Sequence, residues 1–139
     1  DLKPITVEIT YGIERLCMFL NKIGNIYDLF WNETITYKDL RQEAERQFSI
    51  FNFSEANADL LGKWFRECES ECARLLKANL YLPAYDFCLK ASHIFNILDA
   101  KGAVSVAARQ DLIKRIRRLA IQCAKEYLKA KGYLEKENG

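Results

Sequence analysis

The sequence contains little proline, glycine or histidine, and these scarcities exclude several classes of protein. Among its 139 residues are two Pro, six Gly and one His, whereas 50% of the residues are hydrophobic and 12% are aromatic. This composition excludes a disordered, collagen-like or linker-dominated chain. Because 21 basic residues face 19 acidic ones and leave a formal charge of +2, overall charge identifies no partner. The chain is long enough to form a domain with a hydrophobic core.

The sequence also lacks a long hydrophobic run, and its N-terminus lacks the basic and apolar segments of a secretory signal. Its five cysteines include no C-x-x-C pair, which favours a reducing compartment. We therefore expect a cytoplasmic protein that does not enter a membrane. Because the chain begins with Asp1 rather than Met, we expect it to be part of a longer protein.

Near the N-terminus, apolar and polar residues alternate. Ile5, Val7, Ile9 and Tyr11 share one parity, which predicts a β-strand of about seven residues. No other segment is a convincing strand. Since a single strand leaves its backbone N–H and C=O groups unpaired, we expect its sheet neighbours to lie outside this sequence.

After Gly12 the hydrophobic spacing becomes helical. We expect an irregular region over 24–36, an exposed helix or connector over 39–48, and then a bundle of antiparallel helices. The first long helix is expected to begin at Ser54, the second to carry Pro83 in its first turn, and the third to begin near Ser105. The apolar stripe of the first is Leu61, Trp64, Phe65, Cys68, Cys72, Leu75 and Leu76. The predicted fold class is therefore mainly α.

Cys68 and Cys72 are four residues apart and would share one helix face. Two such thiols can bind a metal, but the apolar stripe already explains both positions, and His93 is the only histidine. We interpret the cysteines as core residues and His93 as structural, and we predict no metal site.

The last predicted helix is strongly basic. It carries eight Lys and Arg against two acidic residues, an excess of six positive charges (8 − 2). The basic residues are Arg109, Lys114, Arg115, Arg117, Arg118, Lys125, Lys129 and Lys131. Such a face attracts RNA or an acidic protein, or it is simply solvated. The pattern leaves all three open, because Tyr127 belongs to the apolar stripe of this helix and no other aromatic residue is interleaved to stack bases. Arg115 and Arg118 are the candidate contact residues.

Glu8, Thr10 and Arg15 form a second candidate site where the predicted strand meets the first helix. A helix start offers free N–H groups to an anion, and an arginine adds a planar fork for phosphate oxygens. Glu8 is suited to a cationic group such as an amine. Spacing alone makes this a weak signal, because polar strand faces followed by an arginine are common.

The same residues resemble a known motif. Residues 8–16, Glu-Ile-Thr-Tyr-Gly-Ile-Glu-Arg-Leu, are similar to motif 3 of class II aminoacyl-tRNA synthetases, in the form found in the alpha subunit of bacterial heterotetrameric glycyl-tRNA synthetase. The helical segments resemble that subunit in the same order, including Leu82-Pro83-Ala84-Tyr85 and Leu98-Asp99-Ala100. The resemblance extends from about residue 2 to about residue 127.

The resemblance implies an enzyme that activates glycine with ATP and Mg²⁺ and transfers it to tRNA(Gly). By position, Arg15 matches the catalytic motif 3 arginine on the adenine and γ-phosphate of ATP, and Gly12 leaves room for the nucleotide. Glu8 and Thr10 match positions that face glycine. The implied partners are a beta subunit and a second alpha subunit in a heterotetramer.

The resemblance also implies the domain organisation. Residues 1–33 would be the last strand and motif 3 helix of a class II antiparallel sheet domain, and 34–139 a helical domain. Motifs 1 and 2 are missing from this sequence, so the chain by itself is expected to be inactive. The alternative is a non-catalytic helical module that docks on a partner subunit or on tRNA.

Overall fold

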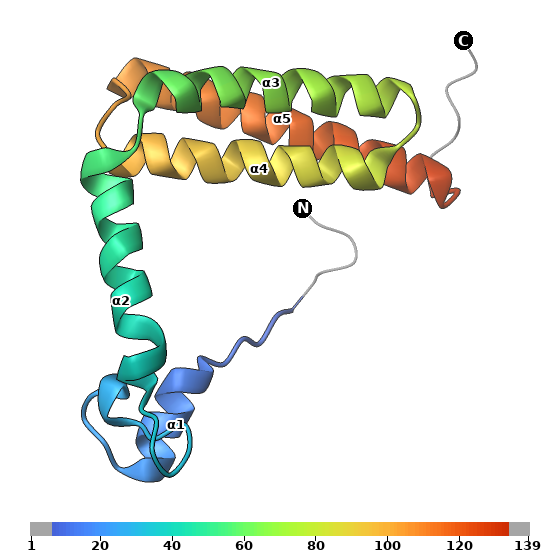
Figure 1. Cartoon of the computed structure of the whole chain (residues 1–139). Coiled ribbons are helices and arrows are strands. Elements are labelled where there is room, and N and C mark those ends of the chain that lie inside the picture. Colours follow the sequence, from blue (N-terminus) through green and yellow to red (C-terminus); the bar gives the residue numbers. More distant parts are fainter. Residues whose placement is uncertain (1–6, 134–139) are drawn as a thin grey trace. The chain divides into compact units, whose positions relative to one another are not determined.

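The computed structural model describes residues 7–133 of the chain (Figure 1). In this part, the α-helices are α1 (Ile13–Asn21), α2 (Tyr37–Ile50), α3 (Ala58–Lys77), α4 (Tyr81–Ala100) and α5 (Val106–Ala130). A short 3₁₀ helix, η1, spans Ile26–Asp28, and a π-helical turn, η2, spans Phe51–Glu55. The prediction of a mainly α chain is confirmed.

The chain divides into two compact units, residues 1–49 and 50–139. By its contacts, α2 therefore groups with the first unit, whereas the boundary expected after residue 33 placed it with the helical domain. That boundary was drawn from the extent of motif 3 rather than from packing, and it stays a prediction.

The strand predicted over residues 5–11 is not formed in its described part. Residues 7–12 carry no regular secondary structure, and Ile5 lies outside the described residues. The physical reason is the one that the sequence indicates: a strand needs a neighbour to pair its backbone groups. In residues 7–133 the only β-type pairing is an isolated antiparallel bridge between Phe30 and Thr36.

The first unit is held together by polar contacts. The Tyr27 hydroxyl donates to the Glu45 carboxylate, and the Tyr37 hydroxyl donates to Glu14 Oε1 at 3.3 Å. These bonds connect α2 with η1 and α1. No side chain of residues 7–49 is buried, so within the described residues this unit has no hydrophobic core of its own.

Helix α3 begins later than the sequence predicted. Its N-cap is Asn57, whose side chain accepts from the Leu60 N–H at 3.0 Å. Ser54 instead belongs to η2, and its carbonyl accepts a bond from the Lys101 ammonium. The predicted start at Ser54 is thus wrong. Ala56, which lies between Ser54 and the N-cap Asn57, is buried in the core and 1% exposed, and α3 begins only after it.

The starts expected for the second and third long helices match the structure because their signals are local. Pro83 lies in the first turn of α4, and Ser105 caps α5 by accepting from the Ala108 N–H at 3.2 Å. Gly102 and Gly132 follow α4 and α5 with φ of +69° and +74°, a conformation that glycine adopts without strain.

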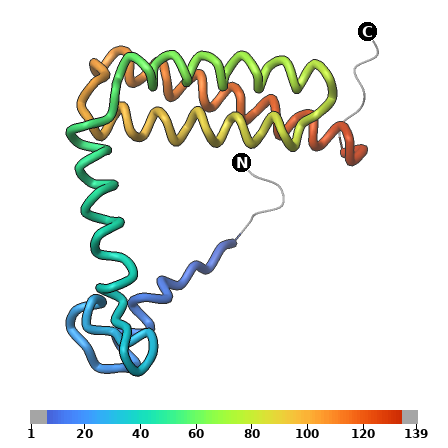
Figure 2. Tube along the Cα trace, viewed as in Figure 1, coloured from blue at the N-terminus to red at the C-terminus, as the bar shows by residue number. Residues whose placement is uncertain are grey.

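Helices α3, α4 and α5 run antiparallel to their neighbours in sequence and form the core of the second unit (Figures 1 and 2). One buried cluster includes Leu61, Phe65, Phe95 and Leu98, and the other includes Cys72, Cys88, Leu119 and Cys123. The predicted stripe of α3 is largely confirmed. Trp64 is the exception, since it remains 48% exposed.

No helix in residues 7–133 combines the length and the apolar character needed to cross a membrane.

Candidate functional site

The start of α1 is an uncapped helix N-terminus. Gly12 is its N-cap residue, with φ −74° and ψ 109°, and its carbonyl accepts from the Leu16 N–H at 3.1 Å. Glycine has no side chain, so none caps the N–H groups of the first turn. These groups and the positive end of the helix dipole favour an anion at this position.

Arg15 lies beside this turn. Its Cγ and Cδ atoms are 3.7 Å from the point where a Cβ on Gly12 would stand. The side chain is exposed, and no ion pair is found for it among residues 7–133. A guanidinium without a carboxylate partner keeps its donors available for a phosphate.

Glu8 and Thr10 are brought together just before α1. The Thr10 hydroxyl donates to Glu8 Oε1, and both side chains are exposed. This bond fixes the direction of the carboxylate and leaves its second oxygen available to an ammonium group. The structure thus pairs Glu8 with Thr10 and Gly12 with Arg15, but no hydrogen bond or ion pair joins the two pairs.

The candidate contact residues of α5 both bind a carboxylate on α3. Arg115 forms a bidentate pair with Glu69, and Arg118 Nη2 lies 3.4 Å from Glu69 Oε1. The Arg115 guanidinium also lies 4.9 Å above the Phe65 ring. Its hydrogen bonds to Glu69 raise the pKa of Arg115 and lower the pKa of Glu69. Arg115 is 27% exposed and Arg118 is 65% exposed, so Arg118 is the more accessible of the two.

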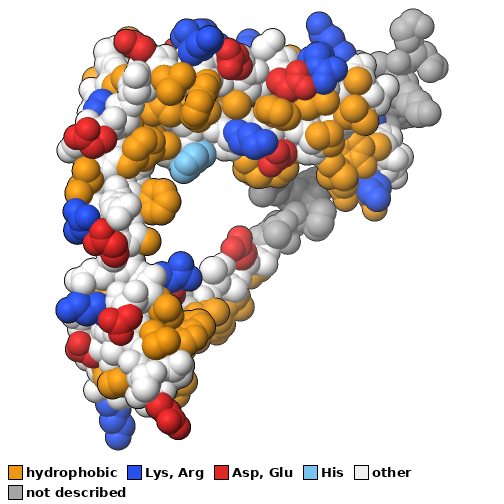
Figure 3. Space-filling view, viewed as in Figure 1, with side chains coloured by type: hydrophobic (Ala, Val, Ile, Leu, Met, Phe, Trp, Pro, Cys, Tyr) orange, Lys and Arg blue, Asp and Glu red, His pale blue; other side chains and the backbone are white. Residues whose placement is uncertain are grey.

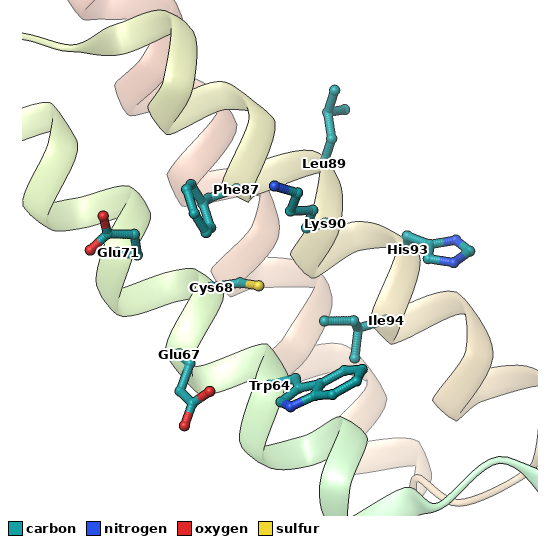
Figure 4. Close-up of a pocket in the computed structure, with 9 residues that line it drawn as sticks. All are labelled: Trp64, Glu67, Cys68, Glu71, Phe87, Leu89, Lys90, His93 and Ile94. Carbon is teal, nitrogen blue, oxygen red and sulfur yellow. The ribbon is translucent and has the colours of Figure 1, made fainter.

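An apolar groove of about 660 Å³ lies between α3 and α4 in the second unit (Figure 4). Trp64, Phe87 and Ile94 line it, and Cys68 and His93 stand at its walls. The Cys68 side chain points into the groove, whereas the His93 ring points away from it (Figure 4). Burial also raises the pKa of the Cys68 thiol, so the two do not form an activated thiolate pair.

The other thiols of the bundle are structural. Cys72, Cys88 and Cys123 are buried, and Cys72 Sγ lies 3.9 Å from Cys123 Sγ. Burial raises the pKa of Cys72 to about 12, which keeps the thiol protonated and unreactive. In the described part of the chain, no three His, Cys, Asp or Glu side chains are grouped as metal ligands.

Sequence reasoning missed Glu69 as the partner of Arg115 and Arg118. It also missed a group of tyrosines, since Tyr81 of α4 and Tyr127 of α5 meet edge to face with ring centroids 5.8 Å apart. In both cases the partners lie on different helices and more than 40 residues apart. Helical periodicity carries no signal for such pairs, because it places residues on a face without saying which face meets which.

The family model described as "Glycyl-tRNA synthetase alpha subunit" matches residues 1–132, which includes Glu8, Thr10, Gly12 and Arg15 as well as α2 to α5. The match therefore extends over both units rather than over a short motif. The chain belongs to the glycyl-tRNA synthetase alpha subunit family.

Proposed function

We propose that the chain serves glycine–tRNA ligase as part of its alpha subunit, in the ATP-dependent formation of glycyl-adenylate and the transfer of glycine to tRNA(Gly). The observation that carries this proposal is the family match over residues 1–132. The geometry at α1 supports it. An uncapped helix start beside an arginine without an ion-pair partner in residues 7–133 fits a polyphosphate.

Each site residue has a proposed role. Arg15 packs on the adenine of ATP, reaches its γ-phosphate and stabilises the charge that develops on pyrophosphate as the glycine carboxylate attacks the α-phosphorus. Gly12 leaves space for the nucleotide. Glu8 accepts from the glycine ammonium group, and Thr10 orients Glu8 and helps to close the pocket against larger amino acids.

Mg²⁺ is proposed to accompany ATP as part of the substrate. Magnesium keeps several waters and binds through phosphates and one or two carboxylates rather than through a protein cage. The described residues contain no cluster of potential metal ligands, and we propose that the ion is held mostly by the ATP phosphates and by residues outside this sequence.

The first unit exposes a large apolar surface that fits a place in a larger catalytic domain. Val7, Ile9, Phe19 and Leu20 are 74–81% exposed, and surfaces of this kind mark sites of packing against other protein. We propose that an antiparallel class II sheet covers them, and that residues 1–33 complete this domain while 34–139 form the helical domain. Since residues 7–133 contain no sheet, the chain alone is expected to be inactive.

The proposed assembly is a cytoplasmic heterotetramer of two alpha and two beta subunits. Arg118 is proposed as a contact with tRNA or the beta subunit because its side chain is 65% exposed. Arg115 supports that surface by holding Glu69, and we retain it as a weaker contact candidate.

Glycine-dependent exchange of pyrophosphate into ATP tests the proposed function. The intact alpha subunit assembled with the beta subunit is expected to catalyse exchange with glycine and not with alanine. The 139-residue chain assayed in the same way is expected to be silent. If the assembled, folded subunits show no glycine-dependent exchange, the proposal is wrong.

Replacing Gly12 by alanine separates folding from ATP binding. The φ of −74° at Gly12 suits any residue, and an added Cβ would meet only the Arg15 stem at 3.7 Å, an ordinary contact. Because alanine is a poorer N-cap than glycine, the free energy of unfolding is expected to fall by no more than about 1 kcal/mol. The KM for ATP is expected to rise severalfold because the methyl group occupies nucleotide space. An unchanged KM for ATP in the exchange assay would remove Gly12 from the ATP site.

A further inference from the structure

A groove lined by three tyrosines lies between α4 and α5. Tyr81 and Tyr85 come from α4 and Tyr127 from α5, and the small side chains of Ala120 and Ala124 also line the groove. The volume of the groove is about 350 Å³. Tyr85 and Tyr127 are 47% and 44% exposed. Hydrophobic side chains also gather at the end of the bundle where α4 begins (Figure 3). We call this feature the tyrosine groove.

Two cations on α5 flank the residues that line the tyrosine groove. Arg117, Ala120, Ala124, Tyr127 and Lys131 follow one another at spacings of three and four residues, which places them on one helix face. Arg117 and Lys131 therefore stand at the two ends of this face. Lys131 Nζ lies 5.9 Å from the centre of the Tyr127 ring.

The charge of the tyrosine groove is not neutralised by nearby carboxylates. None of its lining residues is acidic. The closest carboxylates along the two helices are already paired, Asp86 with Lys90 at 2.7 Å and Glu126 with Lys129 at 3.3 Å. Arg117 has no ion pair in the described part of the chain, in contrast to its neighbours Arg115 and Arg118. The groove is thus a positive, aromatic surface.

Half-exposed aromatic rings flanked by cations suit unpaired nucleotides. Bases stack on the ring faces, and Arg and Lys bind the adjoining phosphates. An acidic protein would bind to the same cations, but its carboxylates would not require exposed aromatic rings beside small Ala side chains. Under the proposed function the enzyme acts on tRNA(Gly), which is therefore the polyanion expected to bind at the groove.

We propose that the tyrosine groove binds unpaired nucleotides of tRNA(Gly), with a base on Tyr85 and phosphates at Arg117 and Lys131. This proposal rests on the proposed function. It adds a contact surface distinct from Arg115 and Arg118, whose guanidinium groups point to Glu69 on α3.

Binding of a tRNA(Gly) transcript to the assembled alpha and beta subunits, measured across a salt series, tests the proposal. Arg117→Glu is expected to weaken binding at least tenfold and to reduce the slope of log K against log salt by about one. Tyr85→Ala is expected to weaken binding about fivefold to a hundredfold. Arg66→Glu is the matched control, because Arg66 is an exposed arginine on α3 without an ion pair among the described residues; it is expected to change little.

Glycine-dependent pyrophosphate exchange needs no tRNA and separates the two proposals. Arg117→Glu and Tyr85→Ala are expected to retain exchange at the parental rate while kcat/KM for tRNA falls in aminoacylation. Unchanged tRNA binding in both variants would overturn the tyrosine groove proposal and leave the proposed function intact. Dissociation of the beta subunit from the variants, seen by size-exclusion chromatography, would also overturn it and make the groove a protein interface. Loss of exchange in the parent enzyme would instead overturn the proposed function.

Discussion

Replacing Arg15 by alanine is expected to lower the rate of glycine-dependent pyrophosphate exchange about 100- to 1,000-fold, the effect of removing one preorganised charged donor from a transition state. Arg15 has no ion pair in residues 7–133 and is exposed at the start of α1, so its removal breaks no structural contact of that kind. The loss should fall on kcat and on the KM for ATP, with little change in the KM for glycine.

Two variants sharpen this test. Arg15→Lys keeps the charge but loses the planar fork, so it is expected to recover only part of the activity. Arg41→Ala is the matched control, because Arg41 is an exposed arginine of the same unit, on α2, outside the proposed site. If Arg15→Ala and Arg41→Ala exchange pyrophosphate at the parental rate, Arg15 does not bind ATP.

The helices of this chain were predictable because their signals are local. Pro83 and Ser105 act within a turn of the helix starts that they mark, and sequence spacing reports such interactions directly. The same kind of local signal, an N-cap serine, predicted that α3 starts at Ser54, and this prediction was wrong. Asn57 is an equally good cap, and only the burial of Ala56 decides between them.

Interactions between distant segments were less predictable. The residues at the start of α1 were found because they lie within eight positions of one another and resemble a family motif. In α5, the sequence showed a basic face but not that Glu69 holds Arg115 while Arg117 has no such partner. The described part of the predicted strand, residues 7–11, is likewise not formed. Its pairing depends on segments that residues 7–133 do not contain.

Replacing Arg115 by alanine is expected to destabilise the helical unit by about 2–3 kcal/mol, the range for charge-assisted bonds to a partly buried carboxylate. Glu69 is 19% exposed and would keep only Arg118, at 3.4 Å. The contact of the guanidinium with the Phe65 ring, at 4.9 Å, would be lost as well. Urea unfolding of residues 50–139, which contain their own buried core, measures the change. Lys63→Ala is the control, since its pair with Glu67 is 3.9 Å long and more than half exposed on both sides, and it should cost less than about 0.5 kcal/mol.

The pH dependence distinguishes the ion pair from simple loss of packing. The hydrogen bonds from Arg115 lower the pKa of Glu69 below its ordinary value of 4.5 in the folded state. The stability that this pair contributes is therefore present above pH 4.5 and is lost as pH falls through the lower, folded-state pKa. The difference in unfolding free energy between the parent and Arg115→Ala should thus shrink below pH 4.5. A difference that stays constant as pH falls through this range would mean that Arg115 acts through its contact with Phe65 rather than through its ion pair with Glu69.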